Sequence, residues 1–140
     1  MKKAEFQQLA DERAIDAQAL LGAQRWTAAY YIAGYAVECA LKACILSHLE
    51  QHPEEIFREK RFSEKCWTHS IVQLVALAGL ESDRINDTIA NPQFGIQWEI
   101  AKDWGPESRY RQITENEARK LVAALTDTKD GVLPWLKARW

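Results

Sequence analysis

The run AAYYIAGYAVECALKACILSHL, residues 28–49, decides the fold class of this chain. Apolar and small residues fill almost every position, so the run predicts a helix that its neighbours cover on nearly all sides. Its alanines and its glycine would let neighbouring helices approach closely. We expect this helix to extend from about Arg25 to Leu49 and the helical region to end at Pro53, because the residue before a proline avoids helical backbone angles.

The charges within this run argue against a membrane span. Glu38 and Lys42 lie near its centre, where a charged side chain would be costly in a bilayer. The N-terminal residues MKKAEFQQ contain no apolar run of the signal-peptide kind. The three cysteines form no CxxC pair, which favours reduced, largely buried thiols over a zinc site or a disulfide framework. The chain is therefore expected to be cytoplasmic and to have no membrane partner.

Length and charge restrict the class further. The chain has 140 residues, of which 47% are hydrophobic, enough for a single domain over residues 1–140 with its own core. The 18 basic and 20 acidic residues nearly cancel, to a net charge of −2. Global charge thus gives no reason to expect nonspecific affinity for nucleic acid.

Helical patterns continue on both sides of the central run. Apolar residues at spacings of three and four between residues 6 and 21 predict a first helix that stops near Gly22. Residues 69–80 predict a further helix with Thr68 as its N-cap, and Ser82 is a candidate cap for the short helix after it.

The last third of the chain predicts an aromatic loop and then a final helix. Asn91-Pro92 is expected to break the preceding helix, and residues 91–113 to form a long aromatic loop. Thr114 and Glu117 fit a capping box, which starts the last helix. No sustained alternation indicates a strand. The predicted fold is an all-α antiparallel bundle of four to five principal helices, with the long loop before the last one.

Two groups of residues carry candidate chemistry. Glu38 and Lys42 are four residues apart and can pair, either as a structural ion pair or as part of a cleft or interface. Tyr31 and Tyr35 share their helix face, a pattern found more often in cores than in ligand pockets.

The second group is Arg109-Tyr110-Arg111, which follows Trp104. Guanidinium groups beside aromatic rings can hold a phosphate and stack a base, although a loop anchored by its aromatic residues would have the same composition. No metal site and no cofactor is expected. His48 and His52 have metal-ligand spacing, but Pro53 follows them, and we favour ordinary helix-end histidines.

Several of these segments resemble the HEPN domain family. The resemblance covers roughly residues 13–125, and its most distinctive part is the run GYAVECALKA, residues 34–43. The remaining segments that resemble the family are Arg13, Asp16-Ala17, Leu20-Leu21, Ala28–Ala33, Thr68–Leu74, Trp104 and Arg109-Tyr110.

The resemblance implies a compact helical bundle that is often a homodimer. Many family members are metal-independent endoribonucleases or toxins of toxin–antitoxin pairs, often beside a small nucleotidyltransferase. Others bind RNA, a nucleotide or a partner protein without catalysis. The partners implied for this chain are a second copy, RNA or a nucleotide, and a cognate nucleotidyltransferase or antitoxin.

The sequence departs from the pattern of the active nucleases, in which four to six residues separate an arginine from a histidine. Seven residues separate Arg61 from His69, and no histidine follows Arg109. We therefore favour a noncatalytic binding module in which Glu38 and Lys42 line the cleft or interface. Trp104, Arg109, Tyr110 and Arg111 would contact phosphate or base.

Two alternatives remain open. The first is a divergent ribonuclease toxin with His69 as general base and Arg61 or Arg109 stabilising the charge that develops on phosphate. The second is a structural subunit of a larger assembly, in which some of the six tryptophans would form an interface.

Overall fold

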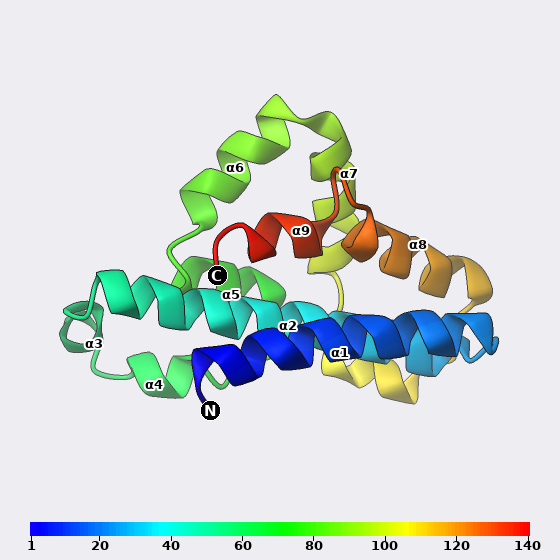
Figure 1. The fold of residues 1–140 in the computed structure, drawn as a ribbon, viewed down its shortest axis with the longest axis horizontal. Helices are drawn as coiled ribbons and strands as arrows, with labels where there is room; N and C mark the ends of the chain where they lie inside the picture. The colour runs from blue at the N-terminus through cyan, green and yellow to red at the C-terminus, as the bar shows by residue number, and fades with distance from the viewer.

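A computed structural model describes all 140 residues as nine α-helices and one 3-10 helix, without strands (Figure 1). The prediction of an all-α fold is confirmed. In chain order the elements are α1 Lys3–Gly22, α2 Trp26–Gln51, α3 Glu55–Arg58, α4 Phe62–Lys65, α5 Ile71–Leu77, α6 Glu81–Ala90, α7 Pro92–Lys102, η1 Pro106–Tyr110, α8 Glu115–Thr126 and α9 Val132–Lys137.

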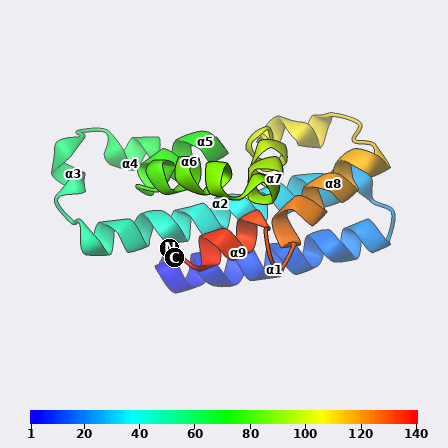
Figure 2. The same cartoon turned by 90° about the horizontal axis from the view of Figure 1, so that it is seen from above.

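Helix α2 is the central element of the fold. It runs antiparallel to α1, and in Figure 2 α1 lies on one side of it while α4, α5 and η1 lie on the other. Helices α8 and α9 also pack against it. Fourteen of its residues are buried, among them Ala29, Ala33, Ala36, Val37, Ala40 and Leu41. Small side chains let its neighbours approach from several directions, as the run of residues 28–49 predicts.

By length and composition alone, α2 is the one helix that could cross a membrane. However, 67% of the residues in its most apolar window are buried inside the structure. This burial is typical of the core helix of a globular domain.

The predicted helix starts are partly right. The capping box is present: the Glu117 N–H donates to Thr114 Oγ1 and the Thr114 N–H donates to the Glu117 carboxylate. Thr68 is not the N-cap of α5. Its hydroxyl is hydrogen-bonded to Gln73 Oε1, and Ser70 caps the helix by accepting from the Gln73 N–H. Ser82 is not a cap either, because α6 begins one residue before it.

The prediction of a long aromatic loop over residues 91–113 is wrong. Asn91 ends α6 but also starts α7, because its side-chain oxygen accepts from the N–H groups of Gln93 and Phe94. Pro92 then occupies the first helical position, where its missing N–H is not needed. Most of the expected loop is therefore α7 and η1, and Phe94 and Trp98 of α7 lie in the core.

Two helices end in the same kind of turn, with one residue in left-handed backbone geometry. After α1 that residue is Gln24, with φ 61°, and the N–H groups of Gln24 and Arg25 donate to Leu21 O and Leu20 O. After α5 it is Gly79, with φ 70°. Both are Schellman motifs, for which glycine is the usual residue. Gln24 adopts the conformation without being glycine, so the turn between α1 and α2 is strained.

Candidate functional site

The centre of α2 holds a buried carboxylate with two partners. Glu38 is 2% exposed. Lys42 Nζ donates to Glu38 Oε1 over 2.8 Å, and His69 Nδ1 lies 2.9 and 3.1 Å from the two carboxylate oxygens. We call these three residues the Glu38 cluster. A carboxylate buried to this extent needs compensating charge and hydrogen bonds, and the cluster supplies both.

The carboxylate also orients the imidazole of His69. Because an ionised carboxylate only accepts hydrogen bonds, the contact favours the proton on His69 Nδ1. Nε2 then has no partner within the chain, and the side chain is 45% exposed. The cluster therefore presents one free ring nitrogen toward solvent.

Two tyrosines extend the site from Glu38 toward the start of α2. The Tyr31 and Tyr35 rings meet edge to face, with centroids 5.3 Å apart. Burial, and next the negative charge of Glu38, raise the pKa of Tyr35. The spacing of Tyr31, Tyr35 and Glu38 thus produces a continuous strip along one face of α2.

Trp104 packs against the two tyrosines of this strip. Its ring centroid lies 6.2 Å from that of Tyr31 and 6.0 Å from that of Tyr35, and the residue is 3% exposed. It occupies the space beside Gly34, where a Cβ atom would come within 2.0 Å of the indole. Trp104 therefore positions the tyrosines and offers no free ring face to a ligand within this chain.

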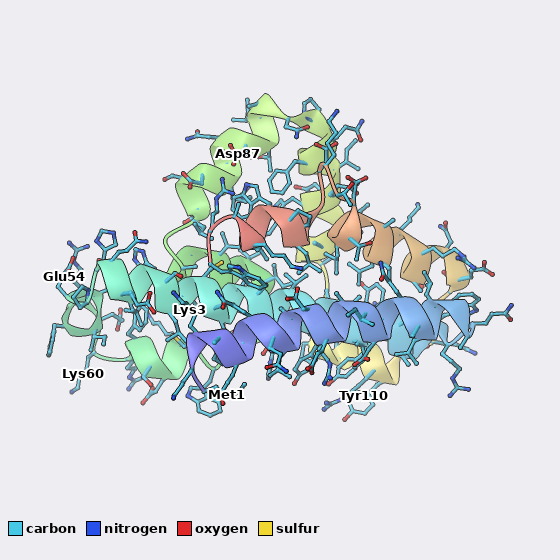
Figure 3. The ribbon with its side chains drawn as sticks, in the orientation of Figure 1. Met1, Lys3, Glu54, Lys60, Asp87 and Tyr110 are labelled. Carbon is cyan, nitrogen blue, oxygen red and sulfur yellow. The ribbon has the colours of Figure 1, made fainter.

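The strip ends at the surface in η1. Arg109 Nη1 donates to Tyr31 Oη over 3.4 Å, and the guanidinium lies 4.8 Å from the centroid of the Tyr110 ring. Tyr110 is 80% exposed and points away from the body of the molecule (Figure 3). Arg111, the next residue, lies over the ring of Tyr30 at 5.9 Å. Arg109 and Tyr110 thus lie together at the surface, whereas Arg111 contacts Tyr30, which is buried.

Arg61 is not joined to this site. It is an exposed residue just before α4, and its ion-pair partner is Glu64 at 3.9 Å. No hydrogen bond or ion pair connects it to His69. The rings of the other two histidines, His48 and His52, lie 4.9 Å apart, and no third potential metal ligand lies with them.

Sequence analysis missed the contact between His69 and Glu38. These residues are 31 positions apart, and helical spacing reveals only neighbours three or four positions apart. The sequence singled out His69 only through its place after Thr68 at a helix start and its separation from Arg61, and neither feature points to Glu38. Comparisons of the chain with protein-family models, curated proteins and solved structures found no match.

Proposed function

We propose that this chain is a cytoplasmic, HEPN-like helical module that binds nucleotide or RNA and does not cleave it. The observation that supports binding is the placement of Arg109. Its guanidinium contacts Tyr31 and Tyr110 at an exposed surface and has no carboxylate within ion-pair distance. An ordered, unpaired guanidinium can bind a phosphate through two parallel hydrogen bonds. The exposed Tyr110 ring beside it can stack on a base.

The geometry of the strip supports binding without cleavage. Arg109 contacts α2 at Tyr31, seven residues before Glu38. At 1.5 Å per residue this places its contact point roughly 10 Å from that of His69 along the helix. A separation of this size between the two contact points does not favour binding of one phosphate by both side chains. The missing arginine–histidine spacing in the sequence agrees with this view.

A divergent metal-independent ribonuclease toxin is the second candidate. It is favoured by His69, whose ring is oriented by a carboxylate and whose Nε2 is free, as a general base requires. In this case a second copy of the chain would bring Arg61 or Arg109 to His69 across a homodimer, and an antitoxin or nucleotidyltransferase would be the partner.

The proposal also includes an antiparallel bundle of five principal helices and a homodimer. We take the five helices of ten or more residues, α1, α2, α6, α7 and α8, as the principal helices of the bundle. Phe57 and Trp67, 90% and 79% exposed, support a protein interface near α3 and α4, either in the homodimer or in a larger assembly.

The decisive experiment incubates wild type, His69→Ala and Arg109→Ala with a mixed RNA pool in EDTA. It measures cleavage on a gel and binding by fluorescence anisotropy of labelled RNA. We expect no cleavage by any protein, and binding that Arg109→Ala weakens about tenfold, since a charged hydrogen bond contributes about 1.5–3 kcal/mol.

The control is Arg58→Ala, an exposed arginine on α3 at the far end of α2 (Figure 1), which should bind as wild type does. Cleavage by wild type that is lost in His69→Ala would replace the binding module with the ribonuclease. Absence of both cleavage and binding would leave only the structural subunit.

A further inference from the structure

A surface cavity of about 470 Å³ lies beside Arg109, at the turn that leads into α2. Its size is within the range of small-molecule sites, about 300–1,000 Å³. It is lined by Gln24, Arg25, Trp26, Thr27, Ala28, Tyr31 and Arg109. The strained residue Gln24 thus belongs to its wall.

The charge of the cavity is the first argument. Five of the arginines have a carboxylate within 4 Å: Arg13, Arg58, Arg61, Arg119 and Arg139. Neither Arg25 nor Arg109 has one, and both line this cavity together with no acidic residue. The cavity therefore carries two guanidinium groups, neither of which has a carboxylate within 4 Å.

The shape of the wall is the second argument. Trp26 and Tyr31 line the cavity beside the two arginines, so aromatic residues adjoin positive charge there. In addition, the first turn of α2 has no side-chain cap, and its free N–H groups favour an anion at the same place. The cavity suits a ligand that joins a flat ring to a strongly negative group.

We propose that this cavity binds a nucleotide through a terminal phosphate monoester. Such a monoester carries a charge of about −1.5 to −2 near neutral pH, which two guanidinium groups balance, whereas an internal phosphodiester carries one negative charge. The cavity takes a single nucleotide unit, either a free mononucleotide or the phosphorylated end of an RNA strand. This inference rests on the proposed function and adds Arg25, which the proposed function does not need.

The test compares adenosine monophosphate with adenosine by titration calorimetry, on wild type, Arg25→Gln and Arg109→Gln. Arg58→Gln is the matched control. We expect adenosine to bind at least about tenfold more weakly than the monophosphate, and each cavity variant to weaken binding of the monophosphate about tenfold. Arg58→Gln should stay within about twofold of wild type. Arg25 is exposed at the helix start, and a thermal melt of each variant checks that it is folded.

A second arm uses hexaadenylate with a phosphate at its 5′ end, at its 3′ end or at neither. Tight binding of the free monophosphate alone identifies a mononucleotide site, and preference for a phosphorylated strand identifies an RNA-end site; both support the proposal. This inference is overturned if the affinity is the same with and without the terminal phosphate and is unchanged in Arg25→Gln. If Arg109→Ala still weakens binding in that case, the proposed function remains intact. If wild type binds none of these probes or the RNA pool, both are overturned.

Discussion

Two charged regions lie along helix α2 and differ in how their charges are compensated. In the Glu38 cluster, a carboxylate that is 2% exposed has both its partners, Lys42 and His69, within the chain. At the start of the helix, Arg25 and Arg109 face a cavity with no carboxylate partner. A buried charge must be compensated for the chain to fold, whereas an exposed guanidinium can stay unpaired because water solvates it. The first region should therefore control stability, and the second should control binding.

Glu38→Gln should break this contrast most strongly. The change leaves Lys42, whose side chain is 20% exposed, without its anionic partner, and should lower the free energy of unfolding by about 3 kcal/mol. Urea denaturation measures the loss. The double variant Glu38→Gln/Lys42→Met should recover part of it, because no uncompensated charge remains.

The matched control for that measurement is Glu99→Gln. Glu99 pairs with Lys102 at the surface, over 2.8 Å, so its loss should change stability by less than about 1 kcal/mol. Equal stability of Glu38→Gln and wild type would contradict the role assigned to the cluster.

Gly34→Ala tests whether Trp104 stabilises the tyrosine strip that lies between the two regions. A Cβ atom at this position would overlap the Trp104 ring, and overpacking of this kind lowers stability by about 1–3 kcal/mol. Gly22→Ala provides the comparison, because no atom lies within 4 Å of its Cβ position and alanine favours the helix. Thermal denaturation should show a lower Tm for Gly34→Ala and an unchanged or higher one for Gly22→Ala. The same Tm for both would mean that Trp104 does not fix the strip.

High pH should lower the free energy of unfolding through the Cys44 thiol, which lies outside both regions. Burial raises the pKa of the Cys44 thiol from 9.0 to about 12. Because the pKa is higher in the folded state, the stability contributed by the neutral thiol is complete below pH 9 and is lost as the pH rises toward 12. By pH 10 this loss should reach about 1 kcal/mol.

Urea unfolding of wild type and Cys44→Ala at pH 8 and pH 10 checks the prediction. The variant lacks the thiol and should lose less stability between the two values. An equal loss in both proteins would assign the pH dependence to other groups, such as Tyr30, whose pKa burial also raises.

Gln24→Gly should have the smallest effect on stability. Gln24 lines the cavity beside Arg25. Glycine adopts the φ of 61° with little strain, so the variant should be more stable by up to about 1 kcal/mol. Gln18→Gly, an exposed position within α1, should lose about the same amount, because glycine disfavours a helix interior. Chemical denaturation of both variants should therefore show opposite signs. A loss of stability in Gln24→Gly would mean that the glutamine side chain stabilises the turn.

Local patterns predicted much of the fold. The run of residues 28–49 predicts α2 as a buried central helix, and the capping box at Thr114 predicts the start of α8, because both depend on neighbours within one or two turns. The prediction of an aromatic loop was wrong because Asn91-Pro92 can end one helix and also start another. Only the packing of Phe94 and Trp98 into the core decides that the chain resumes as a helix there.

The sequence by itself determined the all-α class, the pairing of Glu38 with Lys42, and the gathering of arginine and aromatic residues at Arg109–Arg111. Each follows from helical spacing or from adjacency in the chain. Tertiary structure alone decided that His69 contacts Glu38, that Arg109 contacts Tyr31, and that Trp104 is buried against the tyrosines. These contacts join residues 31 to 78 positions apart. They form only when the helices pack, and no local preference encodes such distances.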